Sequence, residues 1–278
     1  MREYRKKQRI LKKTLNIICI FTAVFMFVYI GVAPFIKELW GMNAITICSR
    51  ICELLVLISV VILTVYNIKY SKCNSLLEWI EYELDDAGYY YLNRNENNAN
   101  EFITNSQRLL IENKFTTQND IDAHDFNIDM GAVNGKNLMY FVNVDNLDRN
   151  DIIAYIDSIT YDATVQNLKR KADIVITFVT NKADNDAIGL SKMITTMGRK
   201  EQVKIALVIA ELDTRKCYFL GNRQTNLLKL IAKYVMMAEL PFSERLIGKD
   251  RLASQDELEE NMKSFNAKDF VDGKFYIR

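Results

Sequence analysis

The stretch TLNIICIFTAVFMFVYIGVAPFI, residues 14–36, contains no charged side chain, and a second apolar stretch, LLVLISVVILTVYNI, follows at residues 54–68. The hydrocarbon core of a bilayer is about 30 Å thick and needs roughly 20 apolar residues in a helix. The first stretch reaches that length alone. The second reaches it when its outer end extends back through Ile51 towards Ala44. The sequence therefore predicts a membrane hairpin of two transmembrane helices over residues 14–70.

The residues before the hairpin are strongly basic, with seven Lys or Arg side chains and one Glu in positions 1–13. Lys and Arg beside a membrane helix stay on the cytoplasmic side. Because the connection at 37–43 is short, the second helix returns to that side. We therefore expect an inner (plasma) membrane protein, bacterial by its Lys-, Asn- and Ile-rich composition, with both termini and the soluble domain cytoplasmic. The basic arm should attract anionic lipid headgroups, by about 1 kcal/mol per basic side chain.

The charge and the cysteine content argue against several classes of protein. The net charge is +1, and because the basic arm precedes a neutral hairpin, residues 69–278 are acidic overall. Nucleic-acid binding needs a basic face, so the composition argues against it. Five cysteines form no C-x-x-C pair and the only histidine is His124, next to Asp125 in a polar segment. This pattern predicts neither a zinc site nor a disulfide framework, and no motif identifies a cofactor.

After the hairpin, the pattern predicts helices followed by alternating strands and helices. Alternation of this kind is typical of a three-layer α/β domain. We expect a mainly parallel sheet whose antiparallel edge hairpin is formed by 203–210 and 217–220, with a helix over 187–197. The expected parts are the arm (1–13), the hairpin (14–70), juxtamembrane helices and polar loops (71–132), the α/β domain (133–247), and a C-terminal helix with an edge segment (248–278).

Polar residues follow two of the predicted strands. Asn181, Lys182 and Asp184 form an NKxD sequence after the strand at 174–179, and Asp145 follows the strand at 138–144. NKxD in this place resembles the guanine-specificity loop of GTPases, but 131–137 (GAVNGKN) does not complete a phosphate-binding loop. α/β sheets bind ligands at the carboxyl ends of their strands. These four residues are therefore candidates for ligand binding without a GTPase assignment.

Glu211, Asp213 and Lys216 are a second candidate group. Carboxylates beside a lysine on a hairpin can hold Mg²⁺ and activate water, as in metal-dependent nucleases. Here the acidic residues fall in the turn, which equally suits a charged hairpin tip. They are the only catalytic candidates, and no complete catalytic motif accompanies them.

Arg50 and Glu53 are the charged residues of the second membrane helix. In one interpretation that helix starts near Arg50, and the pair lies at the outer interface. In the other, the pair is embedded and faces other helices, because a charge in hydrocarbon needs a partner. The second interpretation predicts an oligomer or a pore.

The residues alone do not identify a family. The function expected first is that of a non-enzymatic sensor–effector protein. Its α/β domain would bind a small ligand, such as a nucleotide, or a protein partner, and would couple this event to a hairpin that forms a homo-oligomer. The alternatives are a membrane-tethered metal-dependent hydrolase or nuclease and a passive membrane anchor or scaffold subunit.

Overall fold

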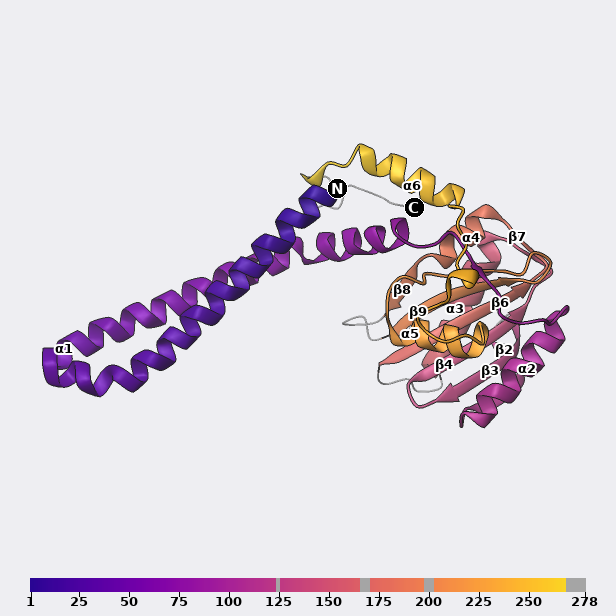
Figure 1. Ribbon diagram of the computed structural model, residues 1–278. Coiled ribbons are helices and arrows are strands. Elements are labelled where there is room, and N and C mark those ends of the chain that lie inside the picture. The colour runs from indigo at the N-terminus through magenta and orange to yellow at the C-terminus, as the bar shows by residue number, and fades with distance from the viewer. Residues whose placement is uncertain (124–125, 166–170, 198–202, 269–278) are drawn as a thin grey trace. The chain divides into compact units, whose positions relative to one another are not determined.

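The computed structural model describes residues 1–123, 126–165, 171–197 and 203–268. The chain divides into two compact units (Figure 1): Met1–Glu81 together with the residues from Met262 onward, and Tyr82–Asn261. His124, Asp125 and the predicted C-terminal edge segment lie outside the described residues.

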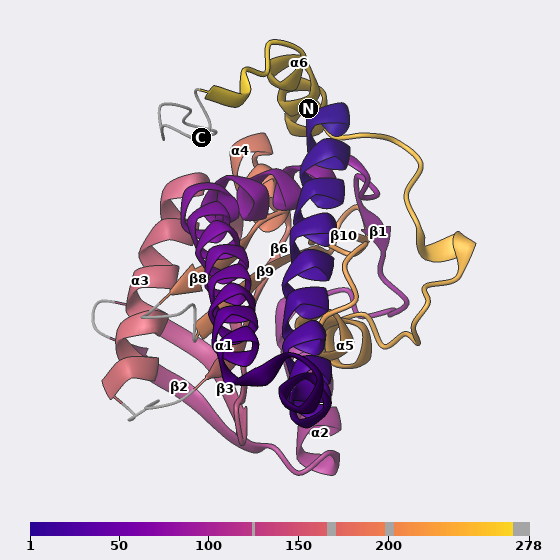
Figure 2. The same cartoon turned by 90° about the vertical axis from the view of Figure 1, so that its left-hand side faces the viewer.

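The first unit is built on α1, Arg2–Leu84, which consists of two helices joined at Gly41. Gly41 has a φ of 81°, which glycine adopts without the steric penalty of a side chain. The two parts, Arg2–Ile36 and Gly41–Leu84, are both long and apolar enough to cross a membrane. This finding agrees with the predicted hairpin, whose arms lie side by side in Figure 2. The basic residues expected to form an arm are the first turns of α1.

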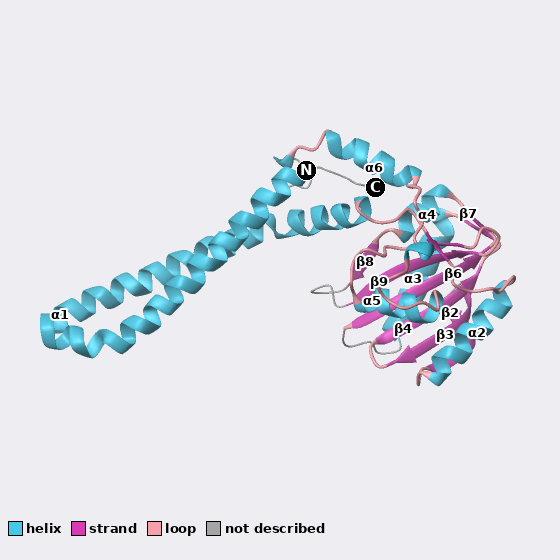
Figure 3. Ribbon diagram, in the orientation of Figure 1, coloured by secondary structure: helices cyan, strands magenta, loops and turns pink. Residues whose placement is uncertain are grey.

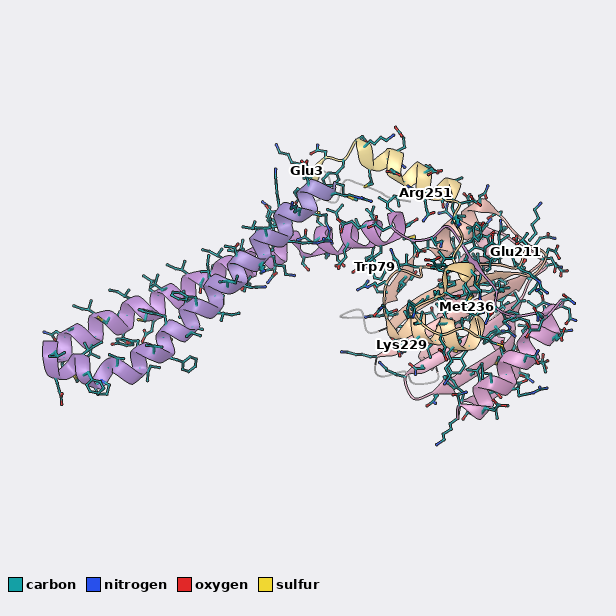
Figure 4. All side chains as sticks on the ribbon, in the orientation of Figure 1. Glu3, Trp79, Glu211, Lys229, Met236 and Arg251 are labelled. Atoms are coloured by element: carbon teal, nitrogen blue, oxygen red, sulfur yellow. The ribbon has the colours of Figure 1, made fainter. Side chains whose placement is uncertain are left out.

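Polar contacts fix the register of the two arms. Their hydrogen bonds run from the turn to the open end: Tyr29 Oη donates to Ile45 O (2.8 Å), the Thr22 and Ser59 hydroxyls are 3.0 Å apart, Tyr66 Oη donates to Gln8 Oε1 (2.8 Å), and Arg5 donates to Asn74 O (2.8 Å). Apolar side chains cover the outer surface of both arms (Figure 4), with Phe21 69% exposed and Ile68 78% exposed. An exposed apolar surface of this size suits lipid contact rather than water.

The second unit contains an eight-stranded sheet in the order β1-β10-β9-β6-β4-β3-β2, and β8 also pairs with β9. The strands are β1 (Tyr90–Tyr91), β2 (Thr116–Ala123), β3 (Phe126–Asn134), β4 (Asn137–Asn143), β6 (Ala172–Thr180), β8 (Ile194–Met197), β9 (Val203–Glu211) and β10 (Lys216–Tyr218). Helices cover both faces (Figure 3), so the domain has three layers.

Alternation along the central strands decides which helices pack on which face. Val175 and Val179 of β6 face α2 (Ala99–Glu112) and α5 (Asn226–Leu230), which continues as the π-helix Ile231–Val235. Ile174, Ile176 and Phe178 face α3 (Arg149–Val165) and α4 (Asn185–Ser191). A strand buried on both faces is apolar at nearly every position, as the sequence ADIVITFVT of β6 is. The helix Ala253–Lys263 (α6) follows the 3-10 turn Glu244–Leu246.

The prediction of a mainly parallel sheet was wrong, because the sheet is mixed. Only β4, β6 and β9 are mutually parallel, and antiparallel strands flank them on both sides. Thr116–Ala123 and Phe126–Asn134 form β2 and β3. These strands lack a strong apolar pattern and pair through the hydrogen bonds of their antiparallel ladder. Part of the expected helix 187–197 is strand β8. β9 and β10 do form the predicted antiparallel pair, but β1 pairs beyond β10 and forms the edge.

A buried ion pair fixes the segment before α2. Arg94 Nη2 lies 2.8 Å from Glu96 Oε1, and the same guanidinium donates to Ser106 Oγ (2.8 Å). Burial by itself would raise the pKa of Glu96. Hydrogen bonds from Arg94 and Asn105 outweigh that effect and lower the pKa to about 2.

The depressed pKa of Glu96 makes domain stability depend on pH. The stabilisation is complete above the unfolded-state pKa and is lost as the pH falls towards 2, because the unfolded chain binds the proton more readily. The difference from the ordinary value corresponds to at most about 3 kcal/mol. We expect Glu96→Gln to flatten the decline in stability between pH 5 and pH 2, measured by hydrogen exchange of the β6 and β9 amides corrected for intrinsic rates. Glu101→Gln, a change at an exposed position on α2, should keep the wild-type dependence of stability on pH. Equal pH dependence in the wild type, Glu96→Gln and Glu101→Gln would contradict the depressed pKa of Glu96.

Candidate functional site

The parallel strands bring both groups of sequence candidates to one edge of the sheet. In the register of β4, β6 and β9, Asn143 pairs with Val179, and Thr180 pairs with Glu211. Asp145, Asn181 and Glu211 therefore lie where the three strands end. The sequence had indicated two unrelated sites, and the topology makes them neighbours.

A short second sheet organises this edge. β5 (Asn146–Leu147) runs parallel to β7 (Lys182–Ala183), and Asp184 N donates to Leu147 O (3.1 Å). The Thr180 hydroxyl is 3.0 Å from Asp145 O and 2.9 Å from Lys182 O. Backbone pairing therefore holds the loops after β4 and β6 together, and their positions do not depend on the exposed side chains.

The four predicted ligand residues have different surroundings. The side chains of Asp145, Asn181 and Lys182 are exposed. Asp184 instead caps α4, with Oδ1 accepting a hydrogen bond from Ala187 N. An N-cap carboxylate satisfies a helix N–H that would otherwise lack an acceptor. An anion, an amide and a cation thus remain open to a polar ligand at this edge.

Glu211, labelled in Figure 4, is buried, and both of its carboxylate oxygens have hydrogen-bond partners. Oε1 accepts from Ala183 N (3.2 Å), while Oε2 accepts from the Thr214 hydroxyl and lies 3.5 Å from Tyr218 Oη. Burial, followed by the Glu211 charge, raises the pKa of the Tyr218 hydroxyl. These contacts give Glu211 a structural role in joining the turn after β9 to β7.

The other two catalytic candidates do not complete a metal site with Glu211. Asp213 is exposed in the turn, and Lys216 Nζ lies 4.4 Å from the centre of the Tyr89 ring. Among the described residues, no group of three or more His, Cys, Asp or Glu side chains is arranged to hold a metal ion. The nuclease-like chemistry of this group therefore has no geometric support.

The charged pair of the hairpin lies within the second arm. This helix begins at Gly41, so at 1.5 Å per residue Arg50 lies about 14 Å and Glu53 about 18 Å from the turn. Arg50 and Glu53 are exposed, and Glu53 Oε1 accepts a hydrogen bond from Ser49 Oγ (3.0 Å). Since Ile45 and Ser59 contact Tyr29 and Thr22, the pair lies beside the charge-free part of the first arm.

A fully buried ion pair, absent from the sequence candidates, joins the segment after α1 to the sheet domain. Lys192 Nζ lies 2.9 Å from Asp86 Oδ2 and donates to Ala87 O and Phe219 O, both at 2.8 Å. Asp86 Oδ1 also accepts from Tyr90 Oη (2.7 Å) and Gly221 N (3.1 Å). Every proton of the ammonium group and both oxygens of the carboxylate are satisfied, as burial requires.

This environment also changes the titration of the buried groups. Burial lowers the pKa of Lys192, and the Asp86 carboxylate opposes that shift. Burial, then the charge of Asp86, raises the pKa of the Tyr90 hydroxyl. The amide of Gln255 donates to Glu83 O (2.8 Å) and Asp86 O (3.2 Å), which ties α6 to the same segment.

Helix α4 connects this ion pair to the candidate ligand loop. Asp184 is its N-cap and Lys192 its C-cap. The helix has seven residues and is therefore about 10 Å long.

One signal in the sequence marks Lys192. It is the only charged residue between Asp186 and Arg199, within an otherwise apolar or neutral segment. A lone lysine in such a segment is a candidate for burial with a partner. The partner was not predictable, because Asp86 ends a run with four other acidic residues: Glu78, Glu81, Glu83 and Asp85.

Comparison with known proteins gives no relative: no family model, no curated protein and no solved structure matches this chain.

Removing one member of the Lys192–Asp86 pair should destabilise the domain strongly. We expect Lys192→Met to lower the free energy of unfolding by about 3–5 kcal/mol, because it leaves a buried carboxylate unpaired. Urea-dependent labelling of Cys217, which is 0% exposed, reports unfolding of this domain at a defined peptide. Lys204→Met, at an exposed position on β9, is the matched control. A change no larger than that of the control would contradict the structural role.

Proposed function

We propose that this protein is a two-pass membrane sensor–effector in which a polar ligand or partner binds at the carboxyl edge of the cytosolic sheet and changes the assembly of the hairpin. The observation that carries this proposal is the arrangement of α4. One end of the helix carries the candidate ligand loop, and the other end holds the segment that continues from α1.

The charges at the sheet edge favour a small polar ligand. Lys182 suits a phosphate or carboxylate, Asn181 supplies both an amide donor and an acceptor, and Asp145 suits hydroxyl or ammonium groups. A nucleotide offers a phosphate for Lys182, base donors and acceptors for Asn181 and ribose hydroxyls for Asp145, and sheets with parallel strands bind nucleotides at this edge. We therefore expect a nucleotide or a chemically similar phosphorylated ligand, with a protein partner as the alternative.

The membrane part of the proposal rests on length, polarity and exposure. Both arms exceed the length of a bilayer span, and the basic residues of the first turns favour a cytoplasmic N-terminus in the plasma membrane. A continuous helix from Gly41 to Leu84 then carries the second span to the cytosolic side. Domain and hairpin are thus linked through one helix and the anchored residue Asp86.

Oligomerisation is the proposed output, because Arg50 and Glu53 are exposed beside the charge-free part of the first arm. At membrane depth, exposed charges need partners of opposite sign. A second copy of the chain supplies both partners of opposite charge. Glu53 of that copy faces Arg50 of the first, and Arg50 of that copy faces Glu53 of the first. The enzymatic alternative has no comparable support, since Glu211 is engaged in structural hydrogen bonds. A passive anchor would tolerate replacement of the hairpin by an unrelated membrane anchor.

Ligand binding is tested by native mass spectrometry of the full chain purified in detergent. We expect a co-purifying phosphorylated small molecule, and we expect Lys182→Ala to remove it. Loss of a hydrogen bond to a charged group lowers affinity by about tenfold or more. Lys204→Ala, at the opposite end of β9, should retain the ligand. A protein that carries no ligand, or equal retention by both variants, would refute the ligand-binding proposal.

Oligomerisation is tested separately by exchanging charges in the hairpin. Arg50→Glu should dissociate the assembly in lipid nanodiscs, because it places like charges at the interface, and the double variant Arg50→Glu/Glu53→Arg should restore it. Single-molecule photobleaching counts the copies in each particle. A wild-type chain that is monomeric, or a double variant that remains dissociated, would count against pairing through these residues.

A further inference from the structure

A polar pocket of about 320 Å³ lies between the two arms of the hairpin at their open end. Its lining includes Arg9 and Lys12 from the first arm and Tyr66, Ser71, Asn74 and Ser75 from the second, together with one carboxylate, that of Glu78. This volume is at the lower end of the range for small-molecule sites, about 300–1,000 Å³. It suits a headgroup better than a whole amphiphile.

The cations of this pocket have different partners. Arg5 is 4% exposed and is committed to Asn74 O and to Glu81, 3.2 Å away. Arg9 also reaches Glu81, but its side chain is 63% exposed. Lys12 is exposed and forms no ion pair with a residue in the described ranges. Lys12 and the outer part of Arg9 therefore remain available to an anion.

The pocket also contains an acceptor that lacks a donor. Asn74 Oδ1 is buried and has no hydrogen-bond partner within the part of the chain that the structure describes, although Asn74 Nδ2 donates to Tyr66 Oη (3.2 Å). A buried polar atom without a partner costs free energy. Because Oδ1 itself is not exposed, a hydroxyl group of a bound molecule would satisfy it only after the Asn74 side chain turns towards the pocket.

The position of the pocket identifies the kind of molecule. The charge-free stretch begins at Thr14, and Lys12 and Lys13 immediately precede it. The pocket therefore lies next to the N-terminal end of that apolar stretch. Exposed apolar side chains adjoin the lining residues along both arms: Ile10 is 57% exposed and Val65 is 56% exposed. A molecule with a phosphate, hydroxyl groups and acyl chains matches the cations, Asn74 Oδ1 and this apolar surface together.

The geometry points to a binding site for the headgroup of an anionic, hydroxyl-bearing phospholipid such as phosphatidylglycerol. The phosphodiester accepts hydrogen bonds from Arg9 and Lys12, a glycerol hydroxyl donates to Asn74 Oδ1, and the acyl chains lie along Ile10 and Val65. This site differs from a general attraction of lipid to basic residues, because only some of the seven N-terminal cations line it. It is independent of the ligand site proposed in the α/β domain.

The test is native mass spectrometry of the full chain in detergent, titrated separately with phosphatidylglycerol, phosphatidylcholine and inorganic phosphate. We expect one phosphatidylglycerol per chain, weaker retention of phosphatidylcholine, and no displacement by phosphate. Lys12→Gln should lower phosphatidylglycerol affinity by about tenfold, the effect of losing one charged hydrogen bond. Lys7→Gln removes the same charge from an exposed position outside the pocket and should leave binding unchanged.

A second variant separates the cavity from its charge. Ser75→Phe fills the pocket without changing the net charge, and Ser75 is exposed, so the helix tolerates the larger side chain. We expect it to lose phosphatidylglycerol while the circular dichroism spectrum is retained. Equal losses in Lys12→Gln and Lys7→Gln, equal retention of both lipids, or binding of free phosphate in place of lipid would each overturn the inference.

Discussion

The buried pair of Lys192 and Asp86 is the interaction on which the link between helix and sheet depends. Two charges in the protein interior are stable only when the surrounding groups replace their hydration. Here two backbone carbonyls replace the hydration of the Lys192 ammonium group. A tyrosine hydroxyl and a backbone amide replace that of the Asp86 carboxylate. The groups come from the residue after Asp86, from β1, and from the segment after β10. The pair therefore requires all of these elements to be in place, and it anchors the residues that follow Leu84 within the sheet domain.

The contacts between the two arms of the hairpin follow the same principle. Exposed apolar side chains cover much of its outer surface, while the contacts between its arms include one hydroxyl pair and two tyrosine hydrogen bonds. Polar groups placed between helices satisfy one another where the surroundings offer no water. Arg50 and Glu53 differ, since they are charged and exposed within a stretch whose exposed side chains are mostly apolar. That difference leads to the proposal of a second copy.

Helices and strands with a clear pattern of apolar residues were predictable from the sequence. Strands that depend on hydrogen bonds to a neighbouring strand were not. The hairpin, α2 and the strands β4, β6 and β9 follow directly from runs such as IVITFV. β2 reads TTQNDIDA and has two buried residues, so its strand structure depends on the ladder with β3. The neighbourhood of Asp145 and Asn181 followed from the parallel order of β4 and β6. The hydrogen bonds of the Glu211 carboxylate and the pairing of Lys192 with Asp86 depend on tertiary contacts. A local sequence pattern does not predict such contacts.

The separation of Asp86 and Lys192 along the chain has a consequence for biosynthesis. The hairpin is complete once residue 84 has been made, but Lys192 follows Asp86 by 106 positions. At about 5–20 residues per second, that interval lasts roughly 5–20 s. Throughout it, Asp86 remains in water at the end of a finished hairpin, where its charge carries no desolvation cost. The apolar hairpin can therefore fold before the sheet domain closes, and the nascent chain completes its apolar part before its polar part.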